Sequence, residues 1–381
     1  MDKFIVHNAN IDGPATHVAI IGVGDYPHLL DGSGEKTDHH DGMSQLTSPP
    51  VSARHLADWF ITKYHNPDKP LGTVTLLCSE SIELKYSNPV SNIDYTIAKA
   101  TLKNVKTALR AWKKHCDKNE ENITFFFYCG HGISQGQDMA LLMSDYGEDN
   151  DNPFDGAIDF KTFQERMKRN CLATHQIYIV DACRVSTDTL IETFGEVGDT
   201  ILSGPGTESA ISTIFYSTLA GAKAYGKKDK PSSFTTMLLK ALNGGGAHDQ
   251  NNDWRISTTR LKEAIDLFMK RAADDERQKV QTPPTDGLVT YDIHFLKGIP
   301  SVEVRVQCNP AEANNRAKLL LKTSDNKEKK QRKELSEQPW DVEVQVGEYI
   351  FSATFDDNQF NNQNHKKYVT PPSPLINLNV Q

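Results

Sequence analysis

The 381-residue sequence lacks the features that would point to a membrane, to nucleic acid or to an oxidising compartment. No apolar stretch reaches the ~18 residues that a membrane-spanning helix needs, and the first residues show no apolar core of a signal peptide. The net charge of −8 leaves no basic surplus for a nucleic-acid or anionic-membrane surface. The six cysteines form no CxxC pair and no metal-binding spacing. We therefore expect a soluble, cytoplasmic protein with free thiols that binds neither nucleic acid nor membrane.

Two regions of different character divide the chain. Residues 16–298 alternate apolar, strand-like runs with amphipathic helical stretches, the pattern of an α/β protein with a mainly parallel sheet. Residues 301–381 instead hold short runs of alternating apolar and polar residues, separated by Asn, Asp, Gly and Pro. That pattern predicts a small all-β sandwich domain. Residues 1–15 are expected to form only a lead-in segment.

Two apolar runs in the first region each end in a reactive side chain. The run 123–130 leads into His131, and the run 176–182 leads into Cys183. Apolar runs without alternation are typical of parallel strands that are covered on both faces. Ligands of such sheets bind beyond the carboxyl ends of the strands. If the two strands are neighbours, the imidazole and the thiol meet at that edge.

A thiol beside an imidazole is the core of a nucleophilic catalyst. The thiolate is the reactive form, and a free thiol with a pKa near ~8.5 is mostly protonated at neutral pH. His131 can accept that proton as the base and later give it to a leaving amine, while Cys183 attacks a carbonyl carbon. The backbone N–H groups of Gly132 and Cys183 are the candidate donors to the oxyanion that forms.

The residues around both side chains resemble those of the caspase-like cysteine peptidases, peptidase family C14. The resemblance rests on Tyr128-Cys129-Gly130-His131-Gly132 and Asp181-Ala182-Cys183-Arg184, with Cys183 following His131 by 52 residues. Caspases place their His about 50 residues before the Cys. The resemblance implies a caspase-like α/β/α sandwich with a mainly parallel six-stranded sheet over residues 16–298. It also implies a thiol protease, a hydrolase of the metacaspase or orthocaspase type from a bacterium, acting in cell death, stress or defence.

The residue two before the thiol predicts the substrate. Caspases have Gln there, whereas metacaspase-like relatives have an aspartate that lines the first pocket, and here the residue is Asp181. A carboxylate at the base of a narrow pocket attracts a cationic side chain. We therefore expect an endopeptidase that cleaves after Arg or Lys through a thioacyl-enzyme. By the same resemblance Ser217 is expected in the pocket wall, and Asp25, which follows the first strand, is a candidate second carboxylate.

This specificity has a consequence for processing. Residues 185–222 correspond, by the resemblance, to the loop between the caspase subunits and the strand after it, and they contain no Lys or Arg. A protease that requires a basic residue cannot cleave itself within that segment. The enzyme is therefore expected to act as one chain.

Other features have simpler interpretations. The acidic run 145–159 suggests calcium, since some relatives are calcium-activated, but its spacing does not match an EF-hand loop and a solvated loop is favoured. No metal and no cofactor are expected. Gly22-Val23-Gly24 is followed by Pro27 where a dinucleotide-binding loop needs glycine.

The alternative to a peptidase is a catalytically silent caspase-fold scaffold that binds its partners through residues 301–381. For the enzyme, the expected partners are a protein or peptide substrate at the thiol and a regulatory protein bound by the same C-terminal domain.

Overall fold

The structure is a computed structural model, and it describes residues 3–82, 85–135, 138–183, 198–202, 210–218, 228–275, 283–357, 359–372 and 374–381. Contacts between residues divide the chain into two units. The first unit holds Met1–Leu239 and Met269–Tyr291, and the second holds Lys240–Phe268 and Asp292–Gln381.

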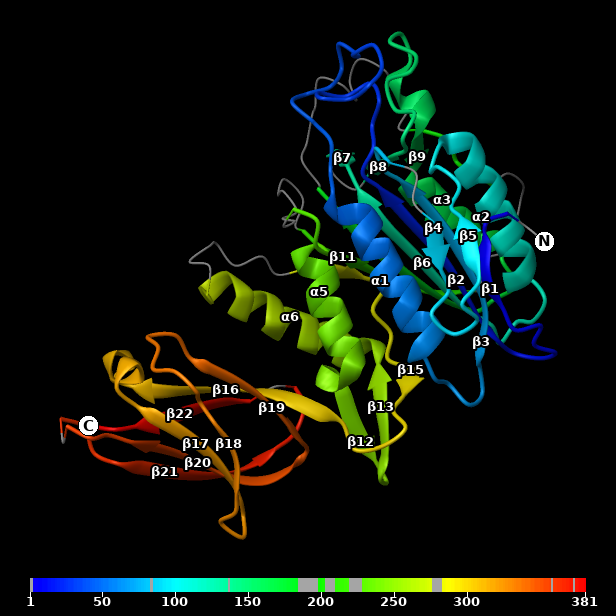
Figure 1. Ribbon diagram of the computed structural model, residues 1–381. Helices are drawn as coiled ribbons and strands as arrows, with labels where there is room; N and C mark the ends of the chain where they lie inside the picture. The colour runs from blue at the N-terminus through cyan, green and yellow to red at the C-terminus, as the bar shows by residue number, and fades with distance from the viewer. Residues whose placement is uncertain are drawn as a thin grey trace. The chain divides into compact units, whose positions relative to one another are not determined.

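A central sheet, with seven strands among the described residues, forms the middle of the first unit (Figure 1). In spatial order the strands are β1 (Ile5–Asn8), β3 (Leu71–Ser79), β2 (Thr16–Val23), β6 (Ile123–Gly130), β10 (His175–Ala182), β11 (Ile211–Tyr216) and β14 (Thr285–Asp286). The inner five strands are parallel, and β1 and β14 are antiparallel to their neighbours. Strands β2 and β6 are buried over their whole length, as unbroken apolar sequences covered on both faces should be.

Helices cover both faces of this sheet (Figure 1). One face is covered by α1 (Ser48–Thr62), which contacts β2, β3 and β6. The other is covered by α2 (Leu102–Cys116) and α3 (Phe160–Asn170), whose apolar side chains join the sheet in one core. Both of these helices begin at a side chain, Thr101 or Asp159, that accepts a hydrogen bond from the backbone N–H three residues on. Such caps satisfy N–H groups that a helix leaves without partners.

Shorter elements complete this part of the chain. A separate sheet of β7 (Gly132–Gln135), β8 (Asp138–Leu142) and β9 (Ala157–Asp159) begins two residues after β6 ends. His131 is therefore held between two strands, with β6 directly before it and β7 directly after it. The remaining elements of the first unit are β4 (Lys85–Ser87), β5 (Asp94–Thr96), a 3₁₀ turn (Pro153–Gly156) and α5 (Ser233–Lys240). A π-turn (Ala241–Gly245) and most of α6 (Thr258–Asp275) belong to the second unit.

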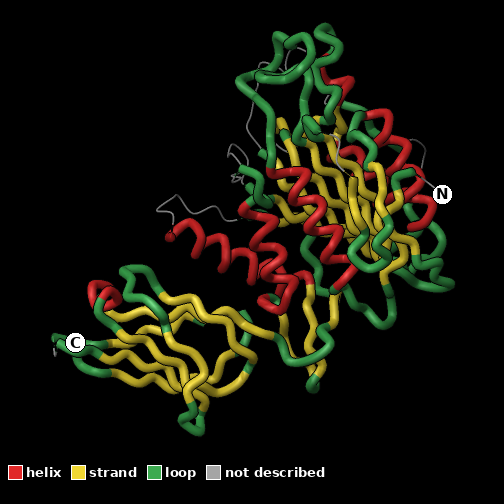
Figure 2. The backbone as a smooth tube through the Cα atoms, in the orientation of Figure 1, coloured by secondary structure: helices red, strands yellow, loops and turns green. Residues whose placement is uncertain are grey.

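The second unit is mostly β structure, with its strands yellow in Figure 2. One antiparallel sheet consists of β12 (Ala247–Gln250), β13 (Asp253–Ser257) and β15 (Asp292–Phe295). Two more sheets enclose an apolar core that includes Val304 and Phe351. Their strands, in spatial order, are β19 (Trp340–Gln345), β16 (Ser301–Asn309) and β22 (Leu375–Asn379), and β18 (Glu328–Gln331), β17 (Lys318–Thr323), β20 (Gly347–Thr354) and β21 (Gln363–Val369). A 3₁₀ turn (Ala311–Asn315) follows β16.

The fold class predicted from the sequence is confirmed: a mainly parallel sheet with helices, and further β sheets in the C-terminal region. The central sheet has seven strands in the described residues where six were expected. One reason is that residues 1–15, expected as a lead-in, contain β1, which pairs with β3. A four-residue strand at a sheet edge leaves too short an apolar pattern to be recognised.

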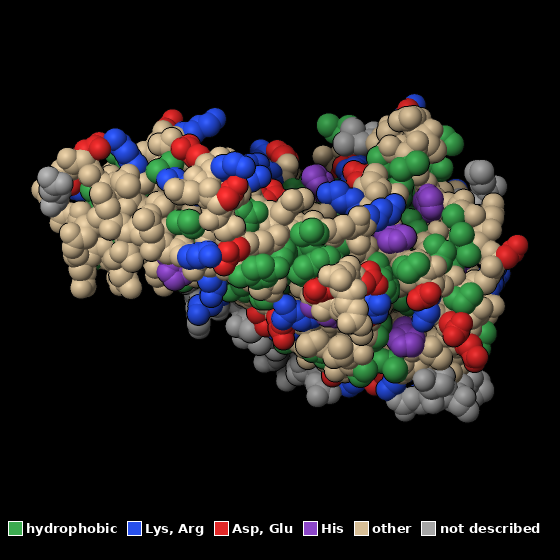
Figure 3. Space-filling model, turned by 90° about the horizontal axis from the view of Figure 1, so that it is seen from below, with side chains coloured by type: hydrophobic (Ala, Val, Ile, Leu, Met, Phe, Trp, Pro, Cys, Tyr) green, Lys and Arg blue, Asp and Glu red, His purple; other side chains and the backbone are tan. Residues whose placement is uncertain are grey.

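Two further properties concern the helices and the surface. Among the described residues, no helix combines the length and the apolar character needed to cross a membrane. On the face shown in Figure 3, basic and acidic side chains are interspersed with apolar ones.

Candidate active site

His131 and Cys183 follow neighbouring strands of the central sheet. β6 and β10 pair in parallel, with Gly130 beside Ala182. The next residue on one strand is His131, and on the other it is Cys183. Gly132 shows the same proximity, since a Cβ at that position would lie 2.8 Å from the Cys183 carbonyl oxygen. The edge of the sheet therefore brings the imidazole-bearing and thiol-bearing residues together.

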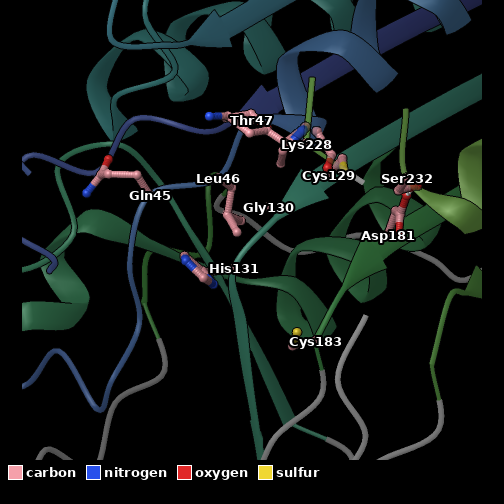
Figure 4. A pocket seen from close by; sticks show the side chains of 12 residues that line it. Gln45, Leu46, Thr47, Cys129, Gly130, His131, Asp181, Cys183, Lys228 and Ser232 are labelled. Atoms are coloured by element: carbon pink, nitrogen blue, oxygen red, sulfur yellow. Dashed lines mark hydrogen bonds between the residues drawn. The ribbon is translucent and has the colours of Figure 1, made fainter. Parts of the chain in front are cut away.

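Both residues line one pocket of about 380 Å³ at this edge. Figure 4 shows His131 and Cys183 on facing sides of the pocket and Asp181 next to Ser232 in another part of it. The segments that precede α1 and α5 supply further lining residues, including Gln45, Thr47, Lys228 and Ser232. A peptide bound here would meet an imidazole, a thiol and a carboxylate in one place.

The His131 ring is held by a backbone carbonyl. Its Nε2 lies 2.7 Å from the carbonyl oxygen of Ser44, in the loop between β2 and α1. Because a carbonyl oxygen only accepts hydrogen bonds, Nε2 must carry the proton, which leaves Nδ1 as the basic nitrogen of the neutral ring. Burial lowers the pKa of His131, against the opposing effect of the Ser44 hydrogen bond. At neutral pH the ring is therefore a neutral base.

Cys183 differs from every other cysteine in its exposure. Of the six cysteines, all within the described residues, Cys183 is partly exposed and the other five are buried. Reactive cysteines are those that solvent or substrate can reach, whereas buried ones are inert. The pocket contains a second thiol, Cys129, but burial raises its pKa well above the ordinary value and keeps it protonated at neutral pH.

The pairing of β7 with β8 sets the direction of the Gly132 backbone. The Leu142 N–H donates to the His131 carbonyl at 3.0 Å, so these two residues form a hydrogen-bonded pair between the strands. Such pairs alternate in an antiparallel ladder, which turns the Gly132 N–H away from β8. A Cβ at Gly132 would also lie 3.1 Å from Ala182 Cβ, so the close approach depends on glycine. The oxyanion roles of Gly132 and Cys183 remain predictions.

Asp181 is a buried carboxylate supplied with several neutral donors. It is 2% exposed, and its Oδ2 accepts hydrogen bonds from Ser232 Oγ and, at 2.8 Å, from Thr235 Oγ1. The side chains of Ser217 and Cys129 also donate to the carboxylate. Burial raises the pKa of Asp181, while all four donors act in the opposite direction. Such a carboxylate in a pocket lining is suited to receive a cationic side chain.

Two predicted substrate-binding residues do not line the pocket. Ser217 is buried and does not line the pocket; its hydroxyl interacts with the Asp181 carboxylate and lies 3.5 Å from the Ala182 carbonyl oxygen. Asp25 directs its carboxylate to Lys99, at 3.5 Å, and its carbonyl accepts from Ser144 Oγ. Asp25 is not among the residues that line the pocket.

The acidic run has a structural contact of its own. The Asp145 carboxylate accepts hydrogen bonds from the Leu102 N–H at 2.9 and 3.1 Å, at the start of α2. In the parts of the chain that the structure describes, no group of three or more His, Cys, Asp and Glu side chains is placed to hold a metal ion.

Sequence reasoning missed the residues that surround the reactive pair. Ser44 acts through its carbonyl, which every residue carries, so no signal could have identified it. Gln45 and Lys228 lie in segments without periodicity. Ser232 directly precedes α5, where its hydroxyl accepts from the Thr235 N–H at 2.9 Å and also donates to Asp181.

Three comparisons show which known proteins this chain is similar to. The family model Peptidase_C14, described as the caspase domain, matches residues 16–285. The chain is 28% identical over 281 residues to "Uncharacterized protein y4kE" of Sinorhizobium fredii, covering 67% of this chain and 79% of that protein. The crystal structure of caspase-1 from Spodoptera frugiperda is similar with a TM-score of 0.42 and 12% identity, over 75% of this chain and 91% of that one. Because the family match covers well over half of its length, the chain belongs to the caspase-domain family of peptidases, C14.

Proposed function

We propose that this chain is a cysteine endopeptidase in which His131 and Cys183 cleave peptide bonds after Arg or Lys. The family supports cysteine-peptidase chemistry in general. The observation that carries the finer proposal is the single pocket lined by His131, Cys183 and Asp181. A nucleophile, a base and a cation-binding carboxylate are then within reach of one substrate residue and the bond that follows it.

The proposed reaction has two stages. His131 Nδ1 takes the proton from Cys183 Sγ, and the sulfur attacks the carbonyl carbon of the scissile bond. The oxyanion that forms accepts hydrogen bonds from the N–H groups of Gly132 and Cys183. The imidazolium then gives its proton to the leaving amine, the C–N bond breaks, and a thioacyl-enzyme remains. Water, deprotonated by His131, attacks this thioester and releases the carboxylic acid and the thiol.

Recognition of the basic residue is assigned to Asp181. Its hydroxyl donors hold the carboxylate in place, so a substrate ammonium or guanidinium group binds it without reorganising the pocket. Cation binding favours the ionised carboxylate, which offsets the effect of burial on its pKa. Arg or Lys before the cleaved bond should therefore be preferred to neutral or acidic residues.

A panel of fluorogenic peptides tests the proposal. Peptides that differ only in having Arg, Lys, Leu or Asp before the cleaved bond are compared on the wild type, on Cys183→Ala and on His131→Ala. We expect cleavage of the Arg and Lys peptides by the wild type and none by either variant. Equal signals from the wild type and Cys183→Ala would show that the chain is not a peptidase and would favour a scaffold role.

A further inference from the structure

The loop between β2 and α1 contacts His131 at three points. Ser44 holds ring atom Nε2 through its carbonyl at 2.7 Å. Tyr26, near the other end of the same loop, accepts a hydrogen bond from the His131 backbone N–H at its hydroxyl, at 2.8 Å. The Tyr26 ring also packs on the imidazole, with centroids 4.8 Å apart and planes tilted by 50°. One loop thus fixes both the backbone and the ring of this residue.

Gln45 fastens the two ends of that loop to each other. Its Oε1 accepts from the Tyr26 N–H at 2.8 Å, and its Nε2 donates to the Tyr26 carbonyl at 2.8 Å and to the Leu30 carbonyl at 3.0 Å. Gln45 directly follows Ser44, so the same amide that holds Tyr26 also sets the place of the Ser44 carbonyl. Its side chain adds to backbone hydrogen bonds that also join the loop, from the Leu46 N–H to the Gly24 carbonyl at 2.9 Å and from the Leu30 N–H to the Met43 carbonyl at 3.1 Å.

The Tyr26 hydroxyl sits in a fully buried cluster that leaves it no alternative position. It donates to the Leu142 carbonyl at 3.3 Å and lies 3.5 Å from the Tyr128 hydroxyl. The Tyr128 hydroxyl, which has one proton to donate, lies 2.7 Å from the His131 carbonyl oxygen and 2.6 Å from the Leu142 carbonyl oxygen. A Cβ at Gly130 would lie 2.6 and 2.7 Å from the two hydroxyl oxygens. The two phenols therefore bracket the backbone of His131 on its N–H and its C=O.

We propose that Tyr26 and Gln45 are positioning residues for His131: they hold the β2–α1 loop so that Ser44 keeps the proton on Nε2 and Nδ1 stays available to Cys183. This inference rests on the proposed function. Without the Tyr26 hydroxyl, the buried His131 N–H loses its acceptor and the ring loses its fixed place. Without the Gln45 amide, the loop loses three of the hydrogen bonds that hold the Ser44 carbonyl near Nε2.

The test compares Tyr26→Phe with Tyr178→Phe. Tyr178 is equally buried in the same core and donates to Gln176 Oε1 at 2.8 Å, so its variant loses a buried hydroxyl without touching His131. We expect Tyr26→Phe to lower kcat on an Arg peptide roughly 10- to 100-fold at nearly constant KM, the range for a displaced catalytic group. Tyr178→Phe should keep the wild-type kcat, with a comparable loss in melting temperature.

A second measurement needs no peptide substrate. The rate at which iodoacetamide alkylates Cys183, followed by mass spectrometry from pH 5 to 9, reports how readily the thiolate forms beside His131. Tyr26→Phe should move the midpoint of this profile upward from that of the wild type, and Tyr178→Phe should not. If the wild type cleaves no basic peptide, the proposed function fails, yet this profile still decides the positioning role.

Gln45→Met provides an independent variant that leaves Tyr26 intact. It should produce the same upward shift in the alkylation profile, and combining it with Tyr26→Phe should add little, because both act through one loop. Alkylation profiles of Tyr26→Phe and Gln45→Met that coincide with the wild type would overturn the proposal. So would additive shifts in the double variant.

Discussion

Asp181→Asn distinguishes the effect of the buried carboxylate on substrate cleavage from its effect on the stability of the fold. The substitution keeps the size of the side chain and an oxygen for Ser232 and Thr235, but it removes the charge. Truncating one partner of a buried, hydrogen-bonded ion pair costs about 2–5 kcal/mol. Since each ~1.4 kcal/mol is a factor of ten, kcat/KM on an Arg peptide should fall roughly 30- to 5,000-fold. Asp181 is only 2% exposed, so solvent screening gives little reason to reduce this range.

The same substitution should stabilise the fold at neutral pH. Burial raises the pKa of Asp181 in the folded protein above its value in the unfolded chain. The protonated carboxyl therefore contributes stability at low pH, and this contribution is lost as the pH rises through the folded-state pKa. An amide does not titrate, so Asp181→Asn keeps its contribution at pH 7. The melting temperature of the variant should exceed that of the wild type at pH 7, and the difference should narrow toward pH 4.

Thermal unfolding between pH 4 and 7 and initial rates on one Arg peptide measure both effects on the same preparations. Asp159→Asn is the matched control, because Asp159 caps α3 outside the pocket and Asn caps helices equally well. It should leave both quantities close to wild type. The reasoning is refuted if Asp181→Asn cleaves the Arg peptide like the wild type, or if its melting temperature falls further below the wild type at pH 7 than at pH 4.

Three further outcomes follow from the site. Gly132→Ala places a Cβ 2.8 Å from the Cys183 carbonyl oxygen, so the free energy of unfolding should fall by about 1–3 kcal/mol, with a lower melting temperature, and kcat should also fall. Gly298→Ala adds a Cβ in open space and should change neither stability nor kcat. Because burial lowers the pKa of His131, the midpoint of the acid limb of kcat/KM should lie below the ordinary histidine value of 6.5, as a pH–rate profile will show. The active enzyme should run as one intact chain on a denaturing gel, and a cut mapped within residues 185–222 would contradict the predicted specificity.

The meeting of His131 and Cys183 was predictable because it depends on the chain's simplest regularity. Two apolar runs without alternation must be strands covered on both faces, and parallel strands end at the same edge. The direction of a single side chain beyond such an edge is not encoded in this way. Asp25 lies two residues after β2, near the same edge where His131 follows β6, yet its carboxylate contacts Lys99, from a segment far along the chain.

The contacts that hold the imidazole were beyond sequence reasoning for a related reason. The Ser44 carbonyl and the amide of Gln45 act within a loop that has no periodicity, and their partners are backbone groups. Strand β1 was missed because four residues at a sheet edge show little pattern. Regular elements are therefore readable from spacing, whereas loops that close on a site become readable only with coordinates.

Because β10 is buried on both faces, its apolar side chains alone do not fix its register with the neighbouring strands. A strand that is apolar on one side only cannot slip by one residue without exposing that side, but β10 could slip and bury nearly as much. After such a slip, the side chain of Cys183, which follows β10, would point to the opposite face of the sheet. Two buried polar side chains remove this freedom: Gln176 donates to two carbonyls near the start of the strand, and Asp181 is tied to Ser232 and Thr235 at its end. Replacing Gln176 and Asp181 by aliphatic residues would therefore raise the stability of the fold but allow the Cys183 side chain to point to the opposite face of the sheet from His131.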